Sequence, residues 1–134
     1  MSLPKSVLTL LLSVLFASVA SGCKGSTVEK DPVQQRNKSE LTEIYTLYQD
    51  FAKRQQHPPK QLSDFNKRDF QELYPIGIQA LQKGDFVAVW GISGRDSGTV
   101  LAYQKDVPNQ GGPVIMADGT YKTLTADEFK AAKK

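Results

Sequence analysis

The sequence predicts an α+β fold: a long N-terminal helix packed on an antiparallel meander of three or four strands, followed by a short C-terminal helix. Apolar residues recur at helical spacing over residues 41–52, which predicts the long helix. From residue 86 onward the apolar runs are short and separated by glycine-containing segments, a pattern typical of strands joined by turns. The chain has 134 residues, enough for one compact domain and too few for two.

The long helix is expected to begin near Asn37 and to end before the pair Pro58-Pro59. Asn37 is followed three residues later by Glu40, which fits a capping box, and the two prolines stop a helix. A single apolar stripe runs between these signals, as in a helix whose one face packs on a sheet. The stripe consists of Leu41, Ile44, Tyr45, Tyr48, Phe51 and Ala52. A shorter helix is expected over residues 76–83.

Four apolar runs are expected to form the strands. They are residues 86–90, 99–103, 114–117 and 120–123, and the connections are residues 94–98, residues 108–112 and the pair Asp118-Gly119. Connections this short join antiparallel neighbours, and Asp-Gly is a favoured pair for a type I′ hairpin turn. Thr125 with Glu128 three residues later fits a second capping box, which predicts a closing helix over residues 126–133.

The N-terminal segment predicts export and a lipid anchor. Lys5 is followed by an apolar run over residues 7–20, which has the length of a signal-peptide core and is too short to span a membrane comfortably. The run closes with Ala20-Ser21-Gly22-Cys23, which resembles the lipobox of bacterial lipoproteins. That resemblance implies diacylglycerol transfer to the Cys23 sulfur, cleavage before Cys23 and acylation of the new amino terminus. An ordinary secretory signal and an uncleaved anchor are the two alternatives.

These signals divide the chain into a signal peptide over residues 1–22, a lipidated cysteine with a flexible tether over residues 23–38, and a single domain over residues 39–134. The expected partner of the acylated Cys23 is membrane lipid, in the bacterial cell envelope. Lys24 follows Cys23, and resemblance to Gram-negative sorting rules then implies the outer membrane. Basic residues are scattered along the chain, which argues against a nucleic-acid partner.

The mature domain resembles the soluble part of bacterial pseudopilins and type IV pilin-like proteins of unknown function. The resemblance rests on the proline-terminated helix, on residues 84–91 and 100–103, and on a Gly-Gly, strand, Asp-Gly, strand ending over residues 111–120. It implies a pilin-like arrangement of helix and meander. A His-x9-Asp-Gly signature of such proteins is incomplete, since Pro108 stands at the histidine position. A lipobox also replaces the apolar helix with which pilins polymerise, so the resemblance implies a tethered domain that does not build filaments.

The expected function is non-catalytic binding or assembly in the cell envelope, with an unidentified envelope protein or cell-wall partner. Trp90, Tyr103 and Tyr121 form a binding platform if they gather on an exposed face of the meander, whereas burial makes them part of the core. A module that binds a small ligand or peptidoglycan is the alternative, and a hydrolase is a weaker one.

The sequence offers little for catalysis, a cofactor or a metal ion. His57 is the single histidine, and Gly91-Ile92-Ser93-Gly94-Arg95 departs from a nucleophile elbow because its last glycine is replaced by arginine. Four aspartates lie near the ends of the expected strands, with a spacing that fits no calcium loop. They are Asp85, Asp96, Asp106 and Asp118, and turn propensity accounts for each of them.

Overall fold

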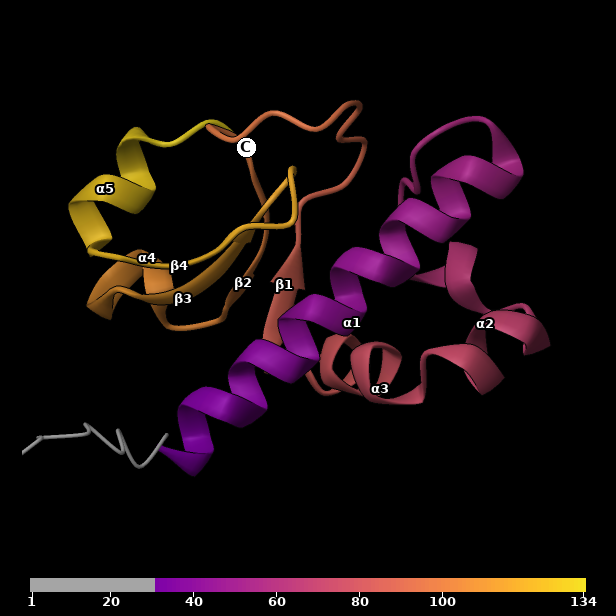
Figure 1. The fold of residues 1–134 in the computed structure, drawn as a ribbon, viewed down its shortest axis with the longest axis horizontal. Helices are drawn as coiled ribbons and strands as arrows, with labels where there is room; N and C mark the ends of the chain where they lie inside the picture. Colours follow the sequence, from indigo (N-terminus) through magenta and orange to yellow (C-terminus); the bar gives the residue numbers. More distant parts are fainter. Residues whose placement is uncertain (1–30) are drawn as a thin grey trace, which may run out of the picture.

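The computed structural model describes residues 31–134, so the signal peptide, the lipobox with Cys23 and the first part of the expected tether lie outside the described residues. The described chain is an α+β domain with a four-stranded antiparallel sheet and helices on both of its faces (Figure 1). The expected α+β class, the antiparallel meander and the short C-terminal helix are confirmed.

The longest helix, α1, spans Pro32–Gln55 and begins five residues before Asn37. Asp31 is its N-cap: the Asp31 carboxylate accepts a hydrogen bond of 3.0 Å from the backbone N–H of Val33, and Pro32 occupies the first turn. Proline suits that position because its missing N–H has no partner in a helix start. Residues 32–38, which the sequence placed in a tether, are therefore helical. The helix ends at Gln55, and its C-cap residue Gln56 adopts a left-handed conformation with φ of 61°.

Three short helical segments follow α1 and lead to the sheet. They are the 3-10 helix η1 (Leu62–Phe65), α2 (Arg68–Leu73) and α3 (Pro75–Lys83). The carboxylate of Glu43 on α1 accepts a hydrogen bond of 3.1 Å from the backbone N–H of Ile76, which ties the start of α3 to α1. Gly77 lets the two helices approach closely, since a Cβ at this position would lie 3.1 Å from the backbone nitrogen of Ile44.

The sheet is a simple meander in the order β1-β2-β3-β4. Its strands are β1 (Phe86–Ala88), β2 (Val100–Gln104), β3 (Gly112–Met116) and β4 (Tyr121–Leu124). The expected first strand is shortened, so Trp90 lies beyond its end. The connection expected over residues 108–112 contains a turn of helix, α4 (Val107–Gln110).

The β3–β4 turn differs from the predicted type I′ hairpin. The backbone N–H of Gly119 donates to the carbonyl of Met116 (2.9 Å), and the N–H of Met116 donates to the carbonyl of Thr120 (2.9 Å). Gly119 has φ of +89°, whereas Asp118 is not among the described residues with positive φ. A type I′ turn needs positive φ at both central residues, so the loop is instead a three-residue connection closed by a glycine bulge.

The two faces of the sheet carry two separate hydrophobic clusters. One face packs on α1 and α3 through a core that includes Tyr48, Phe51 and Phe65. The other face is covered by α4 and by α5 (Ala126–Ala131), whose Phe129 fills the smaller cluster. Thr125 and Glu128 form the expected capping box at the start of α5, with hydrogen bonds of 2.7 and 3.1 Å.

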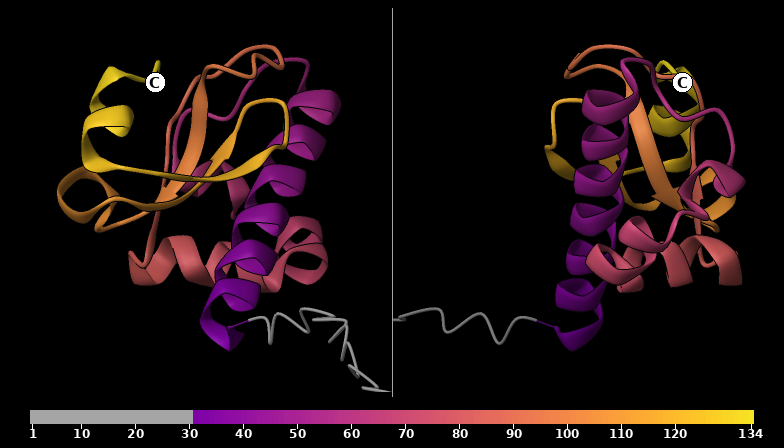
Figure 2. Two further views of the ribbon diagram at one scale, coloured as in Figure 1. Left: turned by 60° about the vertical axis from the view of Figure 1, so that its left-hand side comes forward. Right: turned by 90° about the vertical axis from the view of Figure 1, so that its right-hand side faces the viewer.

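The domain has two distinct ends along α1. At one end lie the first turns of α1, at the bottom of both views in Figure 2, whereas α2 packs beside the last turns of α1, where the Phe70 ring lies 5.7 Å from that of Phe51. At the other end lie the last turns of α1, the segment that follows them and the loop between β1 and β2 (Figure 2). With 24 residues, α1 is about 36 Å long and sets the distance between these ends.

Candidate binding surfaces

The three aromatic residues proposed as a platform do not gather on one surface. Tyr121 pairs with Ile115 across the strands and packs against the core on the α1 face. Tyr103 belongs to the opposite face, where its ring lies 4.6 Å from that of Phe129. Trp90 follows β1, is half-buried and has its ring 5.9 Å from that of Phe65. Trp90 and Tyr121 therefore pack against the cluster on the α1 face, whereas Tyr103 lies on the opposite face of the sheet.

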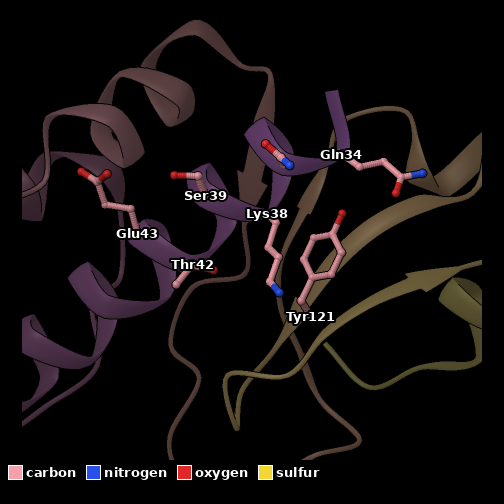
Figure 3. Close-up of a pocket in the computed structure, with 7 residues that line it drawn as sticks. Gln34, Lys38, Ser39, Thr42, Glu43 and Tyr121 are labelled. Carbon is pink, nitrogen blue, oxygen red and sulfur yellow. The ribbon is translucent and has the colours of Figure 1, made fainter. Parts of the chain in front are cut away.

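Tyr121 lines an open groove along the first half of α1 (Figure 3). The α1 residues of this groove are Gln34, Gln35, Lys38, Ser39, Thr42 and Glu43. Lys38 and Gln34 lie beside the Tyr121 ring in Figure 3, whereas Glu43 lies farther along the helix. Partial burial raises the pKa of the Tyr121 hydroxyl, so this hydroxyl stays protonated and can donate a hydrogen bond at neutral pH.

A second cavity, of about 280 Å³, lies at the opposite end of α1, and we refer to it as the distal cleft. It brings together the last turns of α1, the residues that follow this helix and the loop after β1. Its lining consists of Tyr48, Gln49, Ala52, Lys53, Gln56, His57, Pro58, Ile92, Ser93 and Gly94. Polar groups from the end of α1, from the residues that follow it and from the loop after β1 line the cleft together.

Two hydrogen bonds fix the loop after β1, one to α1 and one to the segment Pro58-Pro59 that follows this helix. The buried Tyr48 hydroxyl accepts a bond of 2.7 Å from the backbone N–H of Ile92. The N–H of Gly91 donates a bond of 2.9 Å to the carbonyl of Pro59. Burial raises the pKa of Tyr48, and the backbone N–H groups of Ile92 and Gly91 oppose that shift in part. The neutral hydroxyl of Tyr48 thus holds the loop after β1 against α1 at the distal cleft.

His57 lines the distal cleft, and two contacts hold its ring. Its Nδ1 lies 2.9 Å from the carbonyl oxygen of Pro58, and because a carbonyl only accepts, Nδ1 donates its proton in this bond. In the neutral ring Nε2 then carries the lone pair. The ring also packs edge-on against Phe51, with 5.5 Å between the centroids. These two contacts hold the imidazole in place without a carboxylate.

The charge of the distal cleft is set by Lys53. Lys53 is the one formally charged residue of its lining, and the lining includes no carboxylate. Nearby Asp50 is already occupied, because it accepts hydrogen bonds from Arg54 (2.9 Å) and from the Tyr74 hydroxyl (3.0 Å). Asp64 likewise accepts from the backbone N–H groups of Lys60 and Gln61. An anionic or neutral polar ligand therefore suits this cleft better than a cation.

The structure places His57 and Ser93 in the same cleft, which the sequence did not predict. They are 36 positions apart, and their proximity depends on how the loop after β1 docks on α1. No hydrogen bond joins them among the interactions of residues 31–134, and the two candidate acids, Asp50 and Asp64, bond to other groups. This geometry lacks the carboxylate that orients histidine in a catalytic triad.

The four turn aspartates lie in separate local arrangements. Asp96 accepts hydrogen bonds from the N–H of Gly98 (2.8 Å) and the hydroxyl of Thr99 (3.2 Å), which lower its pKa. Asp118 accepts from the N–H of Thr120 (2.9 Å), which likewise lowers its pKa. Over residues 31–134 no group of three His, Cys, Asp or Glu side chains is placed to hold a metal ion.

Comparison with known proteins gave no match to a family model, a curated protein or a solved structure. Among the helices of residues 31–134 none is long and apolar enough to cross a membrane.

Proposed function

We propose that this protein is a lipid-anchored component of the bacterial cell envelope, whose single domain binds an envelope partner and does not catalyse a reaction. The lipobox-like segment ending at Cys23 supports the anchor. The observation that carries the proposal is the position of the distal cleft, at the far end of α1 from the segment that leads back to Cys23.

The chain between Cys23 and α1 is short. Residues 24–31 span at most about 29 Å in any conformation, because an extended chain advances no more than about 3.6 Å per residue. The start of α1 is therefore held close to the lipid surface. Since α1 extends about 36 Å, the distal cleft lies about one helix length from the point where the tether joins the domain.

A pilin-like origin fits this arrangement. In the described chain a long helix is followed by a four-stranded antiparallel meander, which is the order that the resemblance to pilin-like proteins implies. An acylated cysteine in place of the polymerising helix turns such a domain into a tethered binding module. The outer membrane is the proposed location in a Gram-negative cell.

We propose that the distal cleft binds a carboxylate-bearing component of the cell wall, such as the peptide stem of peptidoglycan. Lys53 supplies the positive charge, and Gln49, Ser93 and the imidazole of His57 supply hydrogen-bonding groups. The lining thus offers one charge for a carboxylate and several groups for neutral amides. A cleft of about 280 Å³ accommodates a short peptide fragment and not a folded partner.

Titration of the mature protein with a purified muropeptide tests this assignment. Trp90, the single tryptophan, lies two residues before Ile92 of the cleft and reports binding by its fluorescence. Lys53→Gln is expected to weaken binding at least about tenfold, since a charge-assisted hydrogen bond contributes about 1.5–3 kcal/mol. Lys130→Gln, an exposed change on α5, is the matched control and is expected to leave binding unchanged. Absence of saturable binding, or equal affinity of the two variants, contradicts the ligand assignment.

A hydrolase remains the second candidate because His57 and Ser93 share the cleft. The two hypotheses differ in one measurable respect. A binding module leaves the muropeptide intact over long incubation, whereas a hydrolase releases fragments that disappear in Ser93→Ala. Mass spectrometry of the incubated muropeptide decides between them.

A further inference from the structure

β4 is an edge strand, and its backbone is bonded on one side alone. The sheet has the order β1-β2-β3-β4, so β4 pairs with β3 and with no other strand of residues 31–134. The N–H of Met116 donates a hydrogen bond of 2.9 Å to the carbonyl of Thr120, which makes these two residues a hydrogen-bonded pair. Such pairs alternate with non-bonded ones along an antiparallel ladder. Lys122 therefore bonds to β3, whereas the N–H and C=O groups of Tyr121 and Thr123 point away from β3.

These outward-facing groups are open to a further strand. The backbone–backbone hydrogen bonds of residues 31–134 include none that reaches the N–H or C=O of Tyr121 or Thr123 from outside the sheet. Thr123 is exposed and Tyr121 is half-buried. A row of unpaired backbone groups at a sheet edge is a template for another extended chain, and many peptides bind proteins in this way. The group that this edge recognises is therefore an extended peptide backbone.

The groove along α1 lies beside this edge. It has a volume of about 840 Å³, and the exposed polar stripe of Gln34, Lys38 and Thr42 forms one wall. The sheet contributes Tyr121, and no residue of β1, β2 or β3 lines the groove, so it opens at the β4 border of the sheet (Figure 3). Side chains of a strand alternate between its two faces. A strand added next to β4 would thus direct every second side chain into this groove.

The charges at this edge favour an acidic peptide. Lys38 lines the groove, and Lys122, which alternates with Tyr121 along β4, is exposed on the other face. Glu43, the one carboxylate among the described residues of the lining, accepts the hydrogen bond of 3.1 Å from the N–H of Ile76 on α3. An acidic side chain on either face of an added strand therefore meets a lysine. A second copy of the chain suits this edge less well, because it would bring the same lysines together.

We propose that the edge of β4 and the groove along α1 form a second binding site, which takes an extended acidic segment of a partner protein as a fifth strand. The backbone groups of Tyr121 and Thr123 pair with this segment, and Lys38 binds an acidic side chain that points into the groove. This site goes beyond the proposed function, since it lies along the first half of α1 and requires neither the distal cleft nor the anchor at Cys23.

NMR titration of the isotope-labelled chain from residue 23 onward, with Cys23→Ser to keep it in solution, tests the proposal. The probes are two end-blocked peptides with the length of a typical strand, about six residues, one alternating valine with glutamate and one alternating valine with lysine. The glutamate peptide is expected to shift the amide signals of Tyr121 and Thr123 and to slow their hydrogen exchange, because both N–H groups become bonded. The lysine peptide is expected to bind about tenfold more weakly, since like charges on facing strands repel.

Variants at the edge and at a distant position sharpen the test. Lys38→Glu is expected to lower the preference for the glutamate peptide about tenfold. Lys83→Glu, the same charge change at an exposed position of α3, is the matched control and is expected to leave the preference unchanged. Thr123→Pro removes one outward N–H without removing a bond to β3 and is expected to weaken the glutamate peptide about twofold to tenfold. Lys38→Glu keeps the test decisive if the proline variant fails to fold.

Four results would overturn the proposal. They are absent shifts at Tyr121 and Thr123 with millimolar peptide, shifts confined to the distal cleft, equal affinity for the two peptides, and an unchanged preference in Lys38→Glu. Edge amides that are protected without peptide, in a chain that sediments as a dimer, mean that a second copy occupies β4 and overturn it as well. None of these readouts depends on the muropeptide or on acylation, so each of them leaves the proposed function standing.

Discussion

Replacement of Gly111 by alanine is expected to destabilise the domain by about 2–6 kcal/mol. Gly111 has φ of 72° and ψ of 171°, a region that only glycine adopts readily, and the backbone strain for another residue is about 1–3 kcal/mol. An added Cβ would also lie 2.7 Å from the carbonyl oxygen of Leu124 and 3.1 Å from the Cα of Thr125. Both neighbours are backbone atoms that no rotamer change can move, so overpacking adds about 1–3 kcal/mol.

Gly84→Ala is the matched control for this prediction. Gly84 also has positive φ, 76°, but a Cβ there would meet no atom within 4 Å. Its expected cost is the left-handed conformation alone, about 1–2 kcal/mol. Urea unfolding of both variants, followed by Trp90 fluorescence and circular dichroism, gives the two free energies of unfolding. If Gly111→Ala lowers the free energy of unfolding no more than Gly84→Ala does, the end of β4 does not lie as close to Gly111 as the structure places it.

Three further predictions concern local contacts and pH. Thr125→Ala removes one half of the capping box of α5 and is expected to cost about 1 kcal/mol in urea unfolding; an unchanged midpoint contradicts the cap. Tyr48→Phe removes the acceptor for the N–H of Ile92 and is expected to cost about 1–2 kcal/mol at pH 7. Because burial raises the pKa of Tyr48, the stabilising effect of the neutral Tyr48 side chain is complete below pH 10 and decreases as the pH rises through the folded-state pKa. The wild type should therefore lose more stability than Tyr48→Phe in alkali. Parallel stability profiles of the two proteins between neutral and alkaline pH contradict the raised pKa. Asp96 has a lowered pKa, so its contribution is present above the unfolded value of 3.8 and lost below it, and Asp96→Asn should show a shallower loss of stability in acid than the wild type.

The start of α1 shows why element boundaries are harder to predict than the elements themselves. Asn37 and Glu40 resemble a capping box, and this local pattern drew the expected start away from Asp31. The true signal, an aspartate followed by proline, was present in the sequence, and the Asp31 side chain caps the helix as such a residue should. In the structure Glu40 pairs with Arg36 one turn earlier on the same helix. The two local capping signals conflict, and the helix begins at the earlier one, Asp31.

The sheet was predictable because alternating apolar runs and short connections leave few topologies. The details of its turns were not. The pair Asp118-Gly119 is compatible with a type I′ turn and with a loop closed by a glycine bulge. The structure has the glycine-bulge loop, in which Gly119 lies against the ring of Tyr45 on α1. Contact with α1 is a tertiary effect that no local pattern encodes.

The candidate site was the least predictable part. Trp90, Tyr103 and Tyr121 were grouped by residue type, but the structure places Tyr103 on the opposite face of the sheet from Trp90 and Tyr121. His57 and Ser93 line the same cleft because the loop after β1 is fixed to α1 through Tyr48. Such proximity arises from packing between distant segments, and a single sequence carries little information about it.

The most direct test of the central claim is the intact mass of the protein extracted from the membrane of an expressing bacterium, measured beside Cys23→Ser. A lipid-anchored protein has the mass of residues 23–134 plus a diacylglyceryl group and an amide-linked acyl chain, and Cys23→Ser lacks these groups and leaves the membrane fraction. A mass without acyl groups, or Cys23→Ser protein that is retained in the membrane as well as the wild type, contradicts the anchor.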